Sequence, residues 1–245
     1  MVQPINNDFA QGLEETEDNL NPQELNKNTR IGFVRKVFGI VAFQLAFTAF
    51  VISLPMYMES VDRYMRSNAS IWTFVVAFIL MITIMYSLFC YRSVARAVPT
   101  NYILLGIFTL AEAWTVSFVC TFYEPMDVFI AAAATAAVVI GLFLYALFTK
   151  VDFTYWLGAM FGILIAWMFL AIFGLFYHNR WTIILWAGLG VIIFSIYIVI
   201  DLWLILGKGR GGFSIDDYIV AAMMLYIDIM RLFLEILKIV GASRR

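Results

Sequence analysis

Carboxylate side chains inside apolar segments are the residues of this sequence whose type and position could support chemistry. Asp201 and Asp228 lie in the last two apolar segments, and Glu112 lies in an earlier one. An ionisable group inside a membrane span costs about 2.5–3.5 kcal/mol, so it normally faces the protein interior or water. We therefore predict a proton- or cation-sensing site at Asp201 and Asp228. Glu112, Arg231 and Glu235 are predicted to be charges that modulate this site.

The depths of Asp201 and Asp228 are compatible with one layer of the membrane. Counted from the same surface at about 1.5 Å per residue, Asp201 lies about 8 Å deep and Asp228 about 15 Å deep. Sequence-based boundaries shift by several residues, so adjacent antiparallel helices could bring the two acids together. Two carboxylates that meet in a low dielectric favour a shared proton, and such a pair can sense pH or receive a cation. Alternatively, each acid only satisfies a neighbouring hydroxyl, amide or cation.

The last apolar segment also contains a charge network of its own. Asp228, Arg231, Glu235 and Lys238 follow one another at intervals of three or four residues, so they share one face of a helix. In this arrangement Arg231 keeps Asp228 ionised without help from another helix. Glu112 has no such neighbour and needs a tyrosine, threonine or arginine from another helix. The sequence leaves open whether Asp228 pairs with Asp201 or with Arg231.

The elements that position these acids are long apolar helices. Of the 245 residues, 63% are hydrophobic and 13% are charged, whereas soluble proteins carry about 25% charged residues. A helix needs about 20 apolar residues to cross a bilayer. We therefore predict an all-α, polytopic membrane protein, a seven-transmembrane-helix bundle in contact with the lipid bilayer. The predicted spans are residues 37–54, 71–90, 100–121, 128–148, 155–177, 181–206 and 218–240.

The domain organisation and orientation follow from where the polar residues lie. Residues 1–30 form an acidic polar tail, residues 31–241 the membrane domain, and residues 242–245 a short basic tail. Basic residues of connecting segments favour the cytosolic side of a membrane. The N-terminal side carries nine of them against five, which predicts an N-terminus on the cytosolic or matrix-like side. The nine are Lys27, Arg30, Arg35, Lys36, Arg92, Arg96, Lys150, Lys208 and Arg210, and the five are Arg63, Arg66, Arg180, Arg244 and Arg245.

Composition also argues against several classes of protein. A net charge of -1 gives no electrostatic basis for a nucleic-acid partner. The single histidine, together with the absence of GxSxG, HExxH and phosphate-loop motifs, argues against an enzyme. Cys90 and Cys120 are isolated in apolar surroundings, so they indicate structural thiols. We predict neither a bound cofactor nor a firm metal site.

Five short motifs occur in an order that resembles the transmembrane Bax-inhibitor-motif family, and within it the lifeguard branch. They cover most of the chain from residue 31 to residue 241. The motifs are IGFVRKVF at 31–38, PTN at 99–101 with FTLAEA at 108–113, FTKVDFT at 148–154, FSIY at 194–197 with Asp201, and LYIDI at 225–229 with LFL at 232–234.

The resemblance implies a fold and a function. It implies seven helices with the seventh central in the bundle. It also implies a pH-sensitive calcium leak across an internal membrane, either endoplasmic reticulum or Golgi or the mitochondrial inner membrane, linked in animals to regulation of apoptosis. The family's paired aspartates correspond to Asp201 and Asp228, where Ca²⁺ would bind only transiently as the permeant ion.

Two departures from the family pattern favour a second function. Arg231 stands where the family usually has a neutral polar residue, and a cation there would hold Asp228 ionised and repel calcium. The family's second-helix arginine has no clear counterpart within the span 71–90, since Arg92 and Arg96 come only at its end. The alternative prediction is therefore a non-conducting structural subunit of a larger organellar membrane complex, contacted through residues 1–30.

Overall fold

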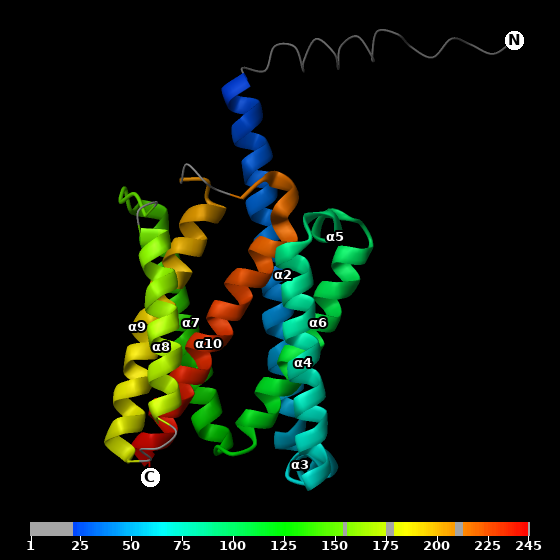
Figure 1. Cartoon of the computed structure of the whole chain (residues 1–245), viewed down its shortest axis with the longest axis vertical. Coiled ribbons are helices and arrows are strands. Elements are labelled where there is room, and N and C mark those ends of the chain that lie inside the picture. Colours follow the sequence, from blue (N-terminus) through cyan, green and yellow to red (C-terminus); the bar gives the residue numbers. More distant parts are fainter. Residues whose placement is uncertain (1–21, 154–155, 175–178, 209–212, 245) are drawn as a thin grey trace, which may run out of the picture.

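The computed structural model describes residues 22–153, 156–174, 179–208 and 213–244, and these residues are helical apart from their connections. The described part of the chain contains seven long helices and short helical segments between them, arranged as Figure 1 shows. The long helices are α2 (Pro22–Tyr57), α4 (Asn68–Cys90), α6 (Thr100–Cys120), α7 (Pro125–Phe148), α8 (Trp156–Gly174), α9 (Arg180–Ile205) and α10 (Tyr218–Arg244). The short ones are α3 (Glu59–Met65), α5 (Arg92–Arg96) and the 3-10 turn η1 (Ile215–Asp217).

Five of the predicted spans are confirmed as helices long and apolar enough to cross a membrane. These are the helices at Asn28–Tyr57, Asn68–Cys90, Thr100–Cys120, Pro125–Phe148 and Arg180–Ile205. The fifth predicted span, 155–177, begins and ends outside the described residues, and the structure describes it as the apolar helix α8, Trp156–Gly174. The seventh predicted span coincides with α10. This helix is not among the five candidate spans because four charged residues interrupt it and make it too polar. The count of seven crossings therefore stays a prediction.

Prolines help to set where the helices begin. Pro99 immediately precedes α6, and Pro125 is the first residue of α7 with Glu124 as its N-cap. Proline is well suited to the first turn of a helix because the missing N–H has no partner there in any case. Pro55 directly follows the predicted span 37–54 but lies inside α2, which continues to Tyr57.

α10 packs against four long helices, α9, α7, α2 and α6. In Figure 1 it runs obliquely between α2, α4 and α6 on one side and α8 and α9 on the other. Its apolar residues Ile219, Leu225 and Leu232 are completely or almost completely buried, whereas α4 exposes Trp72 and Val76. α10, which carries charged residues along its length, is therefore enclosed by helices whose outer surfaces are apolar, as a lipid environment requires.

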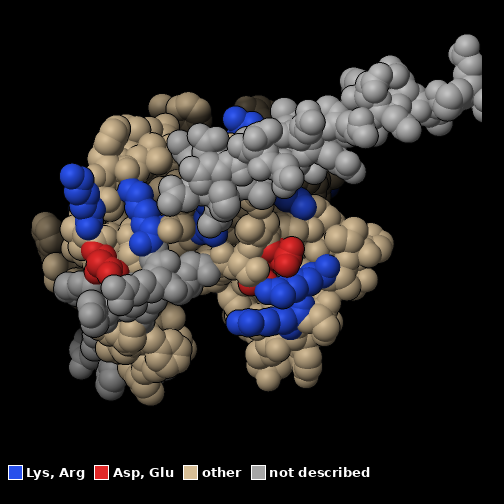
Figure 2. All heavy atoms as spheres, turned by 90° about the horizontal axis from the view of Figure 1, so that it is seen from above, with Lys and Arg blue, Asp and Glu red and all other residues tan. Residues whose placement is uncertain are grey.

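Basic side chains gather on the face at the N-terminal end of α2 (Figure 2). Two of them fix the connection between α9 and α10. Lys208 donates hydrogen bonds to the carbonyls of Ala146 and Leu147 at the end of α7, at 2.8 and 2.7 Å. Arg30 donates to the Phe213 carbonyl at 2.8 Å. The connection is thus tied to both α7 and α2.

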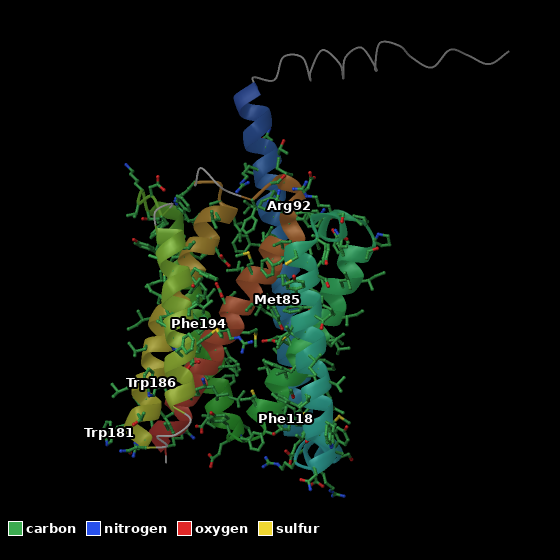
Figure 3. All side chains as sticks on the ribbon, viewed as in Figure 1. Met85, Arg92, Phe118, Trp181, Trp186 and Phe194 are labelled. Atoms are coloured by element: carbon green, nitrogen blue, oxygen red, sulfur yellow. The ribbon has the colours of Figure 1, made fainter. Side chains whose placement is uncertain are left out.

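The opposite face holds the C-terminal end of α10. Arg244 forms an ion pair with the buried Asp127 of α7 at 2.8 Å. Arg180 donates to the Ser243 carbonyl at 2.9 Å. Figure 3 places Trp181 and Phe118 at this end of the molecule and Arg92 at the other. The residues predicted to form a short C-terminal tail continue α10 as far as Arg244, and Arg245 lies outside the described residues.

Candidate functional site

The structure brings Asp201 and Asp228 together. Asp201 lies in the last turn of α9 with 2% of its surface exposed, and Asp228 is half-buried on α10. Their carboxyl groups lie close enough to act directly on each other. A carboxylate only accepts hydrogen bonds, so two carboxyl groups can bond to each other only when one of them carries a proton. The arrangement is that of two acids that face each other from α9 and α10.

Tyr197 is the polar neighbour of this acid pair. It precedes Asp201 by about one turn of α9, and its phenol interacts electrostatically with both acids. Its hydroxyl donates to the Met160 carbonyl of α8 at 2.7 Å, so α8 positions the ring. The Asp201 Oδ2 atom is buried and has no hydrogen-bond partner among the described residues. This free oxygen is available to a proton or a cation.

Arg231 is close enough to three acids to act on them through space, but it touches none of them. It contributes electrostatically at Asp228, Glu112 and Glu235. Among the described residues, it forms no ion pair within 4.0 Å. Asp228 thus makes its direct contact with Asp201, and Arg231 acts on it only at longer range.

The Glu235 side chain is bonded to Lys238 of its own helix and lies against Gly190 of α9. Lys238 donates to Glu235 Oε1 at 2.7 Å, and the carboxyl is 4% exposed. On the facing side, a Cβ atom added to Gly190 of α9 would lie 2.7 Å from Glu235 Cγ. Figure 3 shows Phe194 and Trp186 on the same helix, α9, on either side of this level. The Glu235 side chain therefore lies against bare α9 backbone, at a different level from the aspartates.

Glu112 of α6 is 1% exposed, and its Oε2 atom has no hydrogen-bond partner among the described residues. The tyrosine and arginine closest to it electrostatically are Tyr226 and Arg231 of α10. Sequence reasoning missed Gln44 and Thr48 of α2, which hydrogen-bond to Thr109 of α6 and to Tyr226 of α10. Both are polar residues four positions apart within a predicted apolar span, which is a signal that could have identified them.

A resident metal would need more ligands than these carboxyls provide. The described residues contain no group of three or more His, Cys, Asp or Glu side chains that could hold a metal ion. Protein calcium sites use six to eight oxygen ligands. Two aspartates supply fewer oxygen ligands than such a site uses.

These observations define a class: a multi-pass membrane protein with a protonatable acid pair enclosed by apolar helices. The family described as "Inhibitor of apoptosis-promoting Bax1" matches residues 30–245, and the chain belongs to this family. It is 34% identical to Protein LIFEGUARD 4 of Arabidopsis thaliana, over 96% of this chain and 95% of that protein. It is 30% identical to Protein lifeguard 3 of Mus musculus, over 98% and 80% of the two chains. It is 31% identical to Protein lifeguard 3 of Homo sapiens, over 91% and 73%.

Proposed function

We propose that this protein is a pH-sensitive calcium leak of an internal membrane, with Asp201 and Asp228 as its sensor. The observation that carries the proposal is the close approach of the two acids, which lie on the neighbouring helices α9 and α10. While the proton is shared, the pair holds the two helices together and presents a single negative charge. When the proton leaves, the two carboxylates repel each other and attract a cation. The leak therefore increases as pH rises through the titration of the pair.

The proposal includes seven membrane crossings, with α10 central and charged. The contacts of α10 with α9, α7, α2 and α6 support a central position. The basic face in Figure 2 supports an N-terminus on the cytosolic or matrix-like side. The membrane is that of the endoplasmic reticulum or Golgi, or the mitochondrial inner membrane.

The test is calcium efflux from proteoliposomes that contain the purified chain, measured from about pH 5 to about pH 8. We expect efflux that rises with pH in the unchanged protein. Asp201→Asn and Asp228→Asn each remove one member of the pair, so each should flatten this dependence. Glu235→Gln is the matched control, because it neutralises a buried acid of α10 that is bound to Lys238 and not to the pair. Efflux no higher than that of empty liposomes, from protein of verified fold and orientation, contradicts the proposal.

A second candidate function is a non-conducting structural subunit of a larger organellar complex. Arg231 favours it, because its positive charge acts on Asp228 and would repel calcium. The partner surface would be residues 1–30, of which residues 1–21 lie outside the described part of the chain.

This second function predicts co-purification with a larger assembly in mild detergent. Deletion of residues 1–21, which keeps Arg30 and its bond to the Phe213 carbonyl, should then release the chain at the size of a monomer, while the thermal stability of the membrane domain stays the same. A chain that elutes at the same small size with and without these residues argues against the subunit function.

A further inference from the structure

A second buried polar cluster lies between α2, α6 and α10, away from the aspartate pair. Gln44 and Thr48 come from α2, Thr109 and Glu112 from α6, and Tyr226 from α10. All five side chains are buried, Gln44 with 2% of its surface exposed. The proposed calcium leak does not use these residues as its sensor, so their hydrogen bonds can be considered separately.

The orientation of the Gln44 amide follows from Thr109. The Thr109 hydroxyl donates its one proton to the Leu105 carbonyl at 2.7 Å, so its oxygen can only accept from other groups. The Gln44 atom at 2.8 Å from it is therefore the amide nitrogen, Nε2. This leaves Gln44 Oε1 as the opposite atom, which is buried and has no partner among the described residues.

The same reasoning assigns the donor between Thr48 and Tyr226. Thr48 donates its hydroxyl proton to the main-chain carbonyl oxygen of Gln44 at 2.8 Å. The contact of 2.8 Å between the two hydroxyls must then be donated by Tyr226. The Tyr226 oxygen keeps only its lone pairs for any further partner. Every hydroxyl proton of the cluster is thus used within the protein.

What remains is an excess of oxygen acceptors in an apolar interior. Glu112 Oε2 and Gln44 Oε1 are both buried without a partner, and leaving such groups unsatisfied is costly. A positive ion satisfies several oxygens at once, and carboxylate, amide and hydroxyl oxygens are the ligands that hard cations prefer. Only one of these ligands carries a charge, which matches an ion of charge +1 better than a divalent ion.

We propose that Glu112, Gln44 and Tyr226 form a binding site for a monovalent alkali cation, Na⁺ or K⁺. The other charges near it are few. Between Val37 and Tyr57 of α2, and along α4 and the rest of α6, there is no Asp, Glu, Lys or Arg. On α10, Asp228 follows Tyr226 and is held by Asp201, and Arg231 acts on Glu112 only at long range. Among the described residues, no Lys or Arg forms an ion pair with Glu112 within 4.0 Å, and the positive charge of Arg231 acts on it from farther away.

The test is the thermal unfolding midpoint of the purified full chain in lipid nanodiscs, in NaCl, KCl or choline chloride at equal ionic strength. We expect a saturable rise of about 2–4 °C with Na⁺ or K⁺ over choline, because a ligand that binds only the folded state stabilises it. Glu112→Gln should remove this rise. Gln44→Met keeps the carboxylate, so it should weaken cation affinity about tenfold without abolishing binding.

Two controls separate this site from the proposed calcium leak. Asp201→Asn and Glu235→Gln should both keep the salt-dependent rise, whatever they do to calcium efflux. Equal midpoints in the three salts for the unchanged protein would overturn the proposal and indicate a buried water instead. A rise that survives Glu112→Gln, or one produced by Ca²⁺ and not by Na⁺ or K⁺, would overturn it as well.

Discussion

Gly190→Val should lower the free energy of unfolding by about 2–3 kcal/mol, the usual cost of forcing extra atoms into a packed interior. The first added carbon would lie 2.7 Å from Glu235 Cγ and 2.9 Å from Cδ. Real Cβ atoms do not approach so closely, so Glu235 must move and its 2.7 Å bond to Lys238 is disturbed. Displacing a buried carboxyl from its cation adds to the steric cost. The loss is measured by denaturing the variant and the unchanged protein in the same detergent while the helical circular dichroism signal is monitored.

Gly188→Val is the matched control for this change. Gly188 lies on the same helix, and an added Cβ there would meet nothing within 4 Å. Both substitutions change helix propensity equally, because both replace glycine by valine in the same helix. Only the contact with Glu235 differs between them. If the two variants lose the same stability, Glu235 does not lie against Gly190.

Arg231→Gln should increase calcium efflux in proteoliposomes about tenfold, since local charge changes ion entry by factors of this size or more. The substitution removes a positive charge that acts on Asp228, Glu112 and Glu235 together. Glutamine keeps much of the length and polarity of the side chain, so the packing of α10 is little altered. Without the arginine, the aspartate pair attracts calcium more strongly. Efflux should also become more sensitive to Asp228→Asn.

Lys238→Gln provides the comparison for Arg231→Gln. It removes a positive charge from the same helix, but Lys238 is 43% exposed and binds only Glu235. We expect it to leave efflux nearly unchanged. An equal rise in both variants would show a general effect of charge on α10, and no rise in Arg231→Gln would mean that this arginine does not restrain the leak.

The apolar elements could be predicted well because lipid imposes a length and a composition on each span. Residues 71–90 and 100–121 differ by a few residues at most from α4 and α6. The start of α2 at Pro22 could not be found this way, because hydropathy detects burial in lipid and not helix as such. A helix that continues beyond the membrane surface carries polar residues and gives no apolar signal.

The candidate site was predictable in its members but less so in its contacts. Depth along two antiparallel helices allowed Asp201 and Asp228 to meet, but it left open whether Asp228 pairs with Asp201 or with Arg231. The surroundings of Glu112 depend on how three helices cross, and no spacing along one segment contains that information. Likewise, nothing in the sequence around Gly190 indicates that Glu235 lies against it. Such contacts follow from the tilt of α10, which its pattern of residues does not specify.

Because α10 runs obliquely through the bundle, a change in its tilt would move its two ends the most. A rigid helix that changes its tilt moves its two ends in opposite directions and its middle least. Arg231 is at the midpoint of Tyr218–Arg244, with Asp228 one turn away, so the charges lie near the fulcrum. The ends are anchored beside Arg96–Asp217 on one face and by Arg244–Asp127 on the other. A small rotation of α10 caused by repulsion at the aspartates would therefore produce larger displacements at both membrane surfaces. There the two ion pairs would oppose the movement.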